Sequence, residues 1–384
     1  MERSYDDRDG FIWLDGEIIP WRKAQVHILT HALHYASSVF EGERAYNGKI
    51  FKSKNHSSRL IESGKMLDMP IPYSLEEIEA AKYEILKISG LSDAYVRVIC
   101  WRGSGTDMGV ASAANPVRMA IAVWKWGAYY GDAKMKGAKL DISKWKRPSP
   151  ETIPCHAKAS GLYMICTMSK HDAEAKGCSD SMMYDHRGYV AEATGANIFF
   201  VKDNEVHTPL ADTFLNGITR QTVIDLLTAR GIIVHERHIL PNELNGFEQC
   251  WLTGTAAEVT PVGQIGPHKF TVGKLTKAMI EYNQDHCTNA TWIGVEIADG
   301  FVDDLKKRHK EITKGDKTMT QLDDAHFHLH SAIKAKQHEQ KKMKNMNDFY
   351  NNTNKVMIVD GDLVVYKIAS GSVSYTHLTL PTKA

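Results

Sequence analysis

One lysine set among small and apolar residues places the strongest constraint on how this chain can fold. Lys158 lies in the segment Thr152–Tyr163, which reads TIPCHAKASGLY and begins in a loop that contains a proline. A lysine on an open surface needs no small neighbours, whereas a partly buried lysine that a flat molecule approaches closely does need them. Burial of a lysine favours the free amine, which can form a Schiff base. Although most lysines are ordinary surface charges, this segment predicts a partly buried, reactive amine.

Composition and charge restrict the class of protein. The chain has 384 residues, of which 43% are hydrophobic and 24% are charged, which is typical of a globular protein of about two to three domains. Its 47 basic and 46 acidic side chains leave a net charge of +1, so no overall field favours binding to nucleic acid or to anionic lipid. We expect no signal peptide, because the charged N-terminus lacks an apolar core, and no apolar run is long enough to span a bilayer.

The cysteines indicate the compartment. Six cysteines are scattered along the chain, and none forms a Cys-x-x-Cys pair. This pattern favours a reducing compartment and argues against a disulfide framework or a zinc site. We therefore expect a cytoplasmic protein.

Residues 1–125 carry the signals of a small α/β domain. Asp15-Gly16 and Asn47-Gly48 are turn signals that stand between residues with a preference for strands. Apolar residues recur at helical spacing in two later segments, the second of which ends at Gly90. The expected elements are hairpins over 11–20 and 43–51, helices over 56–67 and 75–89, and strands over 94–101 and 118–123.

A second domain is expected after an aromatic linker. The segment Trp124–Gly131 contains two tryptophans and two tyrosines, and a linker between domains is a natural wall for a ligand cleft. We place the linker at 126–136 and a larger domain at 137–284. The elements expected in this domain are strands over 138–144, 181–185 and 197–201 and helices over 160–176, 219–230 and 273–283.

The sequence changes character at about residue 285, and 285–384 has the composition of a foreign or disordered tail, as a chimeric reading frame would produce. The polar stretch contains His326, His328 and His330, which leaves metal binding open beside a solvated tail. Asp360 and Asp362 lie in a strand-like stretch that resembles the opening strand of phage-type 5′-nucleases, but the rest of a nuclease is missing. The final residues, 373–384, look like translated vector or linker sequence. The catalytic hypothesis therefore excludes the tail.

Three further segments carry groups that suit a phosphorylated aromatic ligand. Glu192 leads into an apolar strand, and it is either a satisfied charge at the strand end or the partner of a pyridinium nitrogen. Asn216–Arg220 opens a helix, where small residues either cap the helix or leave free N–H groups for a phosphate. Thr253–Pro261 contains a second turn of small residues with exposed donors. Two such turns together with Lys158 and Glu192 favour a binding site over ordinary turns.

The first domain contributes polar groups of its own. Thr30–Gly42 mixes histidines, aromatic residues and a glycine, but His31 and His34 fit no standard metal site, so packing or hydrogen-bonding roles are favoured. Tyr95 and Arg97 alternate with valines and therefore share one face of a strand. A buried arginine usually answers a carboxylate or a phosphate.

Taken together, these motifs resemble those of the branched-chain amino acid aminotransferases, which depend on pyridoxal phosphate and have fold type IV. The resemblance covers about residues 10–284, and it is strongest in VAEATGAN at Val190–Asn197 and in FEQCWLTGTAAEVTP at Phe247–Pro261. It implies an α/β (α+β) fold with a small N-terminal α/β domain and a larger pseudo-barrel domain. Ala196 departs from many relatives, which carry a glutamate there, and the family normally ends soon after the helix at 273–283.

The resemblance also implies roles for single residues, and it implies no metal. Lys158 is the implied catalytic residue, which holds pyridoxal phosphate as a Schiff base and moves the α-proton. Glu192 would face the pyridine nitrogen, and Tyr163 would lie near the ring hydroxyl. The implied phosphate contacts are Arg59, Ile218, Thr219 and Thr255. The implied substrate contacts are Tyr95, Thr255 and Ala256 at the α-carboxylate, Phe40, Tyr35, Trp126 and Tyr129 at the branched side chain, and Arg97 at the distal carboxylate of glutamate.

The implied activity is transfer of the amino group of leucine, isoleucine or valine to 2-oxoglutarate, in a homodimer or larger homo-oligomer whose Met108–Val110 loop helps to cover the neighbouring subunit's site. A D-amino acid aminotransferase or an aminodeoxychorismate lyase of the same fold stays open as an alternative, although Tyr95, Arg97 and the Gly127–Tyr129 linker favour branched-chain substrates. A nucleic-acid-binding or nuclease-like protein is a remote alternative that rests on the tail. A further alternative is an inactive protein whose tail blocks folding or dimerisation.

Overall fold

The computed structural model describes residues 3–126, 137–288, 354–359, 362–369 and 372–378. The chain divides into two compact units, Met1–Ile293 and Gly294–Ala384. Tyr129, the three histidines at 326–330 and Asp360 lie outside the described residues, so the predictions for them stay predictions. Within the described part of the chain, no helix is both long and apolar enough to cross a membrane.

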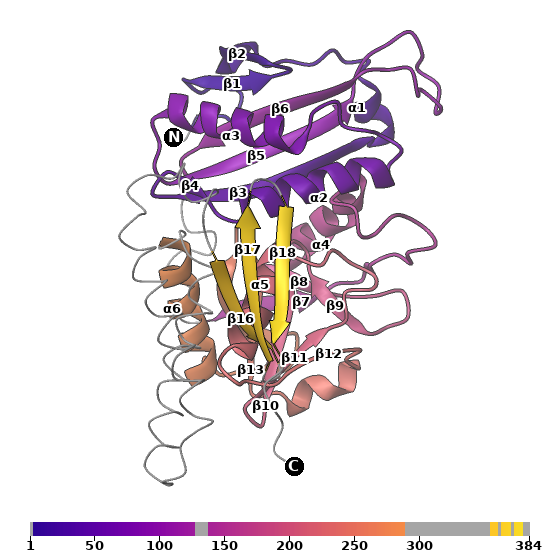
Figure 1. The fold of residues 1–384 in the computed structure, drawn as a ribbon. Helices are drawn as coiled ribbons and strands as arrows, with labels where there is room; N and C mark the ends of the chain where they lie inside the picture. Colours follow the sequence, from indigo (N-terminus) through magenta and orange to yellow (C-terminus); the bar gives the residue numbers. More distant parts are fainter. Residues whose placement is uncertain (1–2, 127–136, 289–353, 360–361, 370–371, 379–384) are drawn as a thin grey trace. The chain divides into compact units, whose positions relative to one another are not determined.

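A six-stranded antiparallel sheet forms the N-terminal part of the first unit (Figure 1). Its strand order is β2-β1-β6-β5-β3-β4, and α2 and α3 pack together on one face through a shared apolar core. The elements of this part are β1 (Phe11–Leu14), β2 (Glu17–Pro20), η1 (Trp21–Lys23), α1 (His31–Tyr35), β3 (Ser38–Tyr46), β4 (Lys49–Ile50), α2 (Ser53–Met66), α3 (Leu75–Ser89), β5 (Ala94–Arg102) and β6 (Val117–Trp124).

Local sequence signals explain why these elements begin and end where they do. Asp15, Gly16, Asn47 and Gly48 all have positive φ angles, as the tight turns of the β1–β2 and β3–β4 hairpins require. The predicted helix over 75–89 is confirmed at both ends. Ser74 and Glu77 form a reciprocal capping box at its start, and Gly90 ends it in the left-handed conformation. The predicted hairpins, the helix at α2 and the two strands at β5 and β6 are also confirmed, within a few residues.

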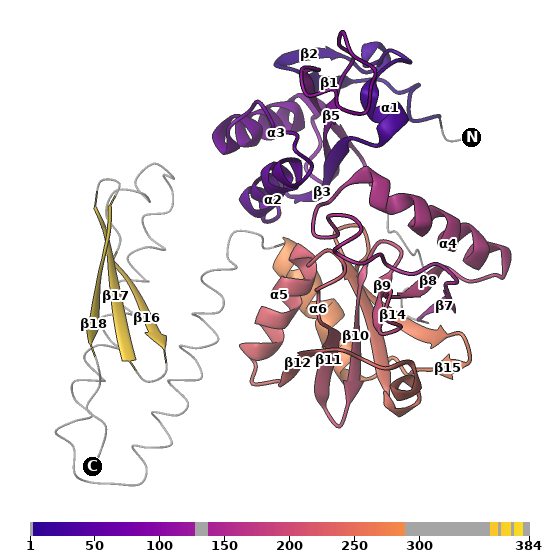
Figure 2. The same ribbon diagram turned by 90° about the vertical axis from the view of Figure 1, so that its right-hand side faces the viewer.

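A nine-stranded mixed sheet forms the rest of the first unit (Figure 2). Its order is β12-β11-β10-β13-β14-β7-β8-β9, with β15 paired to β14. On one face, α5 and α6 bury Val223, Leu227 and Met279 against the stacked rings of Phe199 and Trp251. A second apolar core fills the other side of the strands. Its elements are β7 (Ala138–Ile142), η3 (Ser160–Tyr163), α4 (Met164–Ala175), β8 (Asp180–Tyr184), β9 (Val190–Ala193), β10 (Asn197–Lys202), β11 (Glu205–Pro209), α5 (Ile218–Thr228), β12 (Val234–Arg237), η4 (Pro241–Gly246), β13 (Gln249–Gly254), β14 (Glu258–Ile265), β15 (His268–Lys269) and α6 (Lys274–Thr288).

The strands and helices predicted for residues 137–284 are confirmed, but the sequence did not predict several others. The helix expected over 160–176 begins as the 3-10 turn η3 and continues as α4. The strands β9, β11, β12, β13, β14 and β15 were not predicted. Most of them are short and lack a clear alternation of apolar and polar residues. Pairing with neighbouring strands defines them.

The second unit contains a three-stranded antiparallel sheet, in the order β16-β17-β18. The strands are β16 (Asn354–Val359), β17 (Asp362–Ala369) and β18 (Ser372–Leu378). The strand-like character predicted around Lys355–Tyr366 is therefore confirmed. The third strand, β18, lies largely in the stretch that resembles vector sequence. It pairs in register with β17, Leu363–Ala369 against Ser372–Leu378.

Candidate active site

A cavity of about 290 Å³ within the first unit gathers most of the predicted site residues. One wall comes from the strands β3 and β5 of the first sheet and from the helix α2 that packs on it. The other wall comes from η3, β9, the start of α5 and the turn between β13 and β14. These segments are far apart in the sequence, and the fold brings them around one space. The predicted residues that line it are Phe40, Arg59, Tyr95, Arg97, Trp126, Lys158, Tyr163, Glu192, Ile218, Thr219, Thr255 and Ala256.

Tyr35 lies outside the lining that the described residues form. It ends α1, is 44% exposed, and donates a hydrogen bond from its hydroxyl to the carbonyl of Met108 at 3.1 Å. The hydroxyl thus connects α1 to the Met108–Val110 loop. The predicted substrate contact of Tyr35 stays a prediction.

Lys158 is held on both sides of its backbone and at its amine. Its N–H donates to Ser63 Oγ at 3.0 Å, and its carbonyl accepts from the N–H of Phe40 at 3.1 Å. The Lys158 Nζ donates to Tyr163 Oη at 2.9 Å and lies 5.0 Å from the centre of the Phe40 ring. The small neighbours predicted to matter are buried at Ala157 and Ala159. The amine therefore has a fixed position in the cavity wall.

Glu192 is a buried carboxylate on β9, and it is only 7% exposed. Asn197 Nδ2 donates to Glu192 Oε2 at 3.0 Å, and Arg147 Nε lies 3.3 Å from Glu192 Oε1. Burial raises the pKa of Glu192 to about 7, although the positive charges of Arg147 and Lys158 act in the opposite direction. A ligand that presents an N–H cation to this carboxylate would favour its charged form.

The uncapped start of α5 lies at a second place in the cavity. The helix α5 begins after Gly217, and no side chain among the described residues caps it. The backbone of Gly217, Ile218 and Thr219 lines the cavity there, with the positive end of the helix dipole. Gly217 also donates its N–H to Asn197 Oδ1 at 3.1 Å, which ties the helix start to the partner of Glu192.

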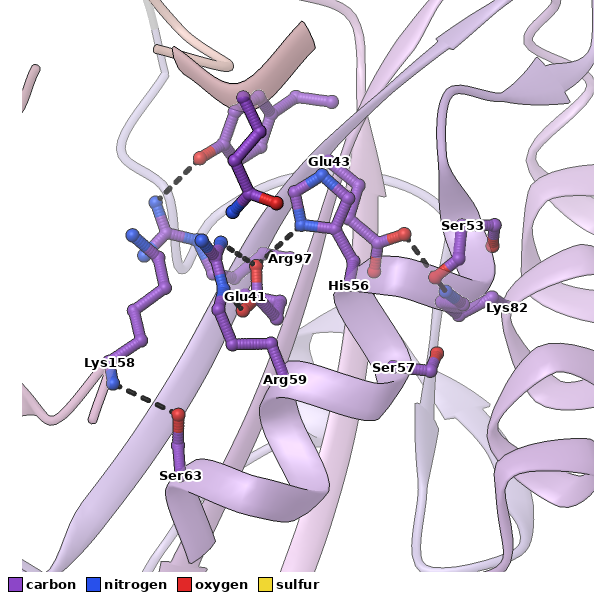
Figure 3. A network of polar contacts seen from close by, with 12 residues as sticks. Glu41, Glu43, Ser53, His56, Ser57, Arg59, Ser63, Lys82, Arg97 and Lys158 are labelled. Carbon is purple, nitrogen blue, oxygen red and sulfur yellow. Dashed lines mark hydrogen bonds and ion pairs between the residues drawn. The ribbon is translucent and has the colours of Figure 1, made fainter. Parts of the chain in front are cut away.

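A buried network orients Arg59 at the same cavity (Figure 3). Arg59 donates to both oxygens of Glu41, at 2.7 and 2.8 Å, and His56 Nδ1 lies 2.6 Å from Glu41 Oε2. Burial alone would raise the pKa of Glu41, but Arg59 and His56 hold it well below its usual range. The Arg59 Nη1 is buried and, among the described residues, has no hydrogen-bond partner. A phosphate in the cavity would satisfy this donor together with the start of α5.

Tyr95 and Arg97 share one face of β5, as their alternation predicted. Arg97 Nη2 donates to Tyr95 Oη at 3.1 Å, and the guanidinium lies 4.7 Å from the centre of the Phe40 ring. Trp126 stacks on Tyr95 with ring centres 4.6 Å apart. Gly42 leaves the space for the Tyr95 hydroxyl, which a Cβ at this position would overlap. This end of the cavity therefore combines aromatic surfaces with one cation.

Outside the cavity, the described residues contain one cluster with ligands of the kind that metals prefer. The ligand atoms of Glu205, His207 and His235 lie within 4.8 Å of one another on β11 and β12. Arg237 Nε donates to His207 Nδ1 at 3.2 Å, however, so this nitrogen is occupied and a guanidinium stands beside it. The arrangement opposes the binding of a cation.

Four residues that position the site were not predicted from the sequence. Ser63, Glu41 and Arg147 gave no local signal, because each acts through a partner that is distant in the chain. Asn197 was part of the quoted VAEATGAN motif, and its place at the start of a strand after Glu192 was a signal that could have found it.

Comparison with known proteins agrees with this geometry. Residues 38–265 match the family model of class IV aminotransferases. A branched-chain-amino-acid aminotransferase of Pseudomonas aeruginosa is 39% identical over 276 residues, which are 71% of this chain and 90% of that protein. The crystal structure of a branched-chain aminotransferase from Thermoproteus uzoniensis with norvaline is similar at a TM-score of 0.71 and 30% identity, over 75% of this chain and 98% of that one.

A second similar crystal structure holds a bound ligand. A branched-chain amino acid aminotransferase from the organism abbreviated T.th., complexed with N-(5′-phosphopyridoxyl)-L-glutamate, is similar at a TM-score of 0.70 and 35% identity, over 74% of this chain and 95% of that one. The fold, the cavity and these similarities lead to one assignment. The chain belongs to the class IV aminotransferases.

Proposed function

We propose that this chain transfers the amino group of leucine, isoleucine or valine to 2-oxoglutarate, with pyridoxal phosphate bound at Lys158. The observation that carries the proposal is the meeting of an amine, a buried carboxylate and free N–H groups around one cavity of about 290 Å³. The names of the similar proteins support the substrate class, and the phosphopyridoxyl complex of one of them supports the cofactor.

The cavity residues fit the parts of the cofactor. Arg59, Ile218, Thr219 and Thr255 would hold the phosphate, because they offer a buried unpaired guanidinium donor and the uncapped start of α5. Glu192 would face the ring nitrogen, and Tyr163 the ring hydroxyl. When bound, pyridoxal phosphate supplies an aldehyde that bonds to amines and a ring that withdraws electrons from the α-carbon.

The residues of the chain would then move the proton. Lys158 Nζ is the base that takes the α-proton of the amino acid and the acid that returns it. Tyr163 Oη, 2.9 Å away, keeps Lys158 Nζ in the cavity while it exchanges the proton. Ser63 and Phe40 fix the backbone of the same lysine, so that only its side chain moves during the proton transfer.

The other end of the cavity suits two different side chains. The α-carboxylate would meet Tyr95 Oη and the backbone N–H groups of Thr255 and Ala256. Phe40 and Trp126 offer the apolar surface that a branched side chain needs, with Tyr129 and Tyr35 as further predicted contacts. Arg97, which lies over the Phe40 ring, would receive the distal carboxylate of glutamate or 2-oxoglutarate.

We also propose that the chain works as a homodimer or larger homo-oligomer in the cytoplasm. Val26, Ile28 and Leu33 are 52%, 74% and 62% exposed, and Val26 and Leu33 line an apolar groove over β1, β5 and β6. An apolar surface of this kind on a globular protein is usually covered by another chain. A second copy would cover it and bring its Met108–Val110 loop near the active site, as the family resemblance implies.

The alternative enzymes and the nuclease-like interpretation are not favoured. The similar proteins described above carry the names of branched-chain aminotransferases. Every cation and carboxylate on which the proposal rests lies in the first unit, whereas Asp362 belongs to the second.

A substitution at the amine tests the proposal. Lys158→Ala should lower the rate of leucine transamination by at least about 1000-fold, because the general base and the covalent anchor are lost together. The purified wild-type protein should show a visible absorbance band that leucine bleaches, and the variant should not. Lys144→Ala, at a lysine that is 67% exposed and paired with Asp172, is the matched control. Wild-type transamination in the Lys158→Ala protein would refute the assignment.

A further inference from the structure

A strained residue ends the turn that closes one side of the cavity. The turn Thr255–Ala257 connects β13 to β14, where Gly254 pairs with Glu258, and Thr255 and Ala256 line the cavity. Glu258 has a φ of 53°, in the left-handed region that residues with a side chain avoid. Such a conformation persists only where surrounding contacts hold it.

Contacts from the other sheet hold Glu258. Tyr46 Oη donates to Glu258 Oε1 at 2.9 Å, and Arg44 Nη1 lies 3.3 Å from the same oxygen. The Arg44 and Glu258 side chains are 14% and 20% exposed, so solvent screens the pair only in part. The Arg44 guanidinium also lies 5.1 Å from the centre of the Tyr46 ring. Two residues of β3 thus converge on one carboxylate oxygen of β14.

The pairing of β3 with β5 links Arg44, Tyr46 and Glu258 to Tyr95, a proposed substrate contact. Arg44 is the cross-strand partner of Tyr95 in the β3–β5 pair. On the other side of the turn, Thr260 Oγ1 donates to the carbonyl of Ala257 at 2.7 Å. Arg44 therefore connects the strand of Tyr95 to the residue that ends the turn.

We propose that Arg44, Tyr46 and Glu258 form a clamp that positions the Thr255–Ala257 turn against Tyr95 and so sets the affinity for the α-carboxylate of the substrate. The three residues are positioning residues, since they lie outside the described lining of the cavity. This inference rests on the proposed function, which assigns the α-carboxylate to Tyr95 and to the N–H groups of the turn.

The test separates substrate affinity from chemistry. Tyr46→Phe removes the hydroxyl that donates to Glu258, and Glu258→Gln keeps an acceptor oxygen but removes the ion pair. In the pyridoxal-phosphate-loaded protein, binding of 4-methylvalerate, a branched carboxylate without an amino group, is measured by titration, and kcat and KM are measured with leucine. Each variant should weaken 4-methylvalerate binding and raise the KM for leucine by about fivefold to tenfold, as expected for the loss of one partly buried hydrogen bond or ion pair. The kcat should change by less than about twofold, because uniform binding is lost.

The double variant and a control decide whether the residues act as one unit. Because the hydroxyl of Tyr46 and the guanidinium of Arg44 hold the same oxygen of Glu258, the loss of either contact already releases the turn. Tyr46→Phe/Glu258→Gln should therefore weaken binding by less than the product of the two single effects. Tyr73→Phe, at a tyrosine that packs on Trp13 away from the cavity, should leave both constants unchanged. Unchanged 4-methylvalerate binding in both single variants would overturn the clamp. Additive effects of the two substitutions on binding would also overturn it. A third contrary result would be a fall in kcat as large as the loss of binding, together with a lowered melting temperature. A wild-type protein without leucine activity would instead refute the proposed function.

Discussion

At the residue scale, the site depends on carboxylates whose charge is set by their partners. Glu41 and Glu192 are both buried. Glu41 accepts two hydrogen bonds from Arg59 and one from His56, and its pKa is lowered despite burial. Glu192 has a single arginine at 3.3 Å, and burial raises its pKa to about 7. The difference suits the proposed roles, because Glu41 must stay charged to hold Arg59, whereas the proposal has Glu192 become charged beside the cation of a ligand.

The raised pKa of Glu192 predicts a pH dependence of stability. Between pH 4.5 and 7 the folded protein holds a proton on Glu192 that the unfolded chain has lost, so this contribution to stability is present below pH 4.5 and is lost as the pH rises to about 7. In the cofactor-free protein, the free energy of unfolding should fall over this interval by on the order of 3 kcal/mol from this group. Urea unfolding at several pH values measures it.

The matched variant for this prediction is Glu192→Gln, which keeps the shape of the side chain and cannot titrate. Its unfolding free energy should lack the part of the pH slope that Glu192 contributes. An identical slope in the wild-type and Glu192→Gln proteins would show that the carboxyl is charged throughout this pH range.

At the element scale, α2 connects the core of the first sheet to the active site. Arg59 and Ser63 are four residues apart on the helix and therefore lie on one face, toward the cavity segment (Figure 3). Ser57, two residues before Arg59, instead donates to Glu79 of α3 at 2.6 Å. The helix thus has one side that packs in the domain and one that positions cavity groups.

This division predicts different effects for two serines of α2. Ser63→Ala removes the acceptor for the N–H of Lys158, and Ser57→Ala removes a donor to Glu79. Each should lower the free energy of unfolding by about 1 kcal/mol, since each removes one hydrogen bond of a partly buried group. Only Ser63→Ala should also lower kcat for leucine, because it frees the backbone of the catalytic lysine. Equal kcat in both variants would contradict the role given to Ser63.

At the scale of the whole molecule, the residues that line the candidate active site all belong to Met1–Ile293. The three apolar cores also consist of residues in this unit, up to Tyr282. The three-stranded sheet of β16, β17 and β18 belongs to the second unit and pairs within itself. The two larger sheets both belong to the compact unit Met1–Ile293, and the division into domains at 1–125 and 137–284 stays a prediction.

A shortened chain tests whether the first unit is sufficient. A protein ending at residue 293 should remain folded, because its cores are complete, and should transaminate leucine within about twofold of the full chain. Its mass in solution, measured by light scattering, should be twice that of the monomer if the groove at Val26 and Leu33 is covered by a second copy. Loss of folding or activity would show that residues 294–384 contribute to the enzyme.

Most local elements, and the candidate reactive groups, could be predicted from the sequence. The Asp-Gly and Asn-Gly turns, the capping box at Ser74, and Lys158 among small residues depend on neighbours in the chain, and such short-range signals are readable without the fold. Which charges come into contact could not be predicted in this way. The lowered pKa of Glu41, the raised pKa of Glu192 and the contacts of Glu258 depend on burial and on distances between residues far apart in the chain, which the fold alone sets.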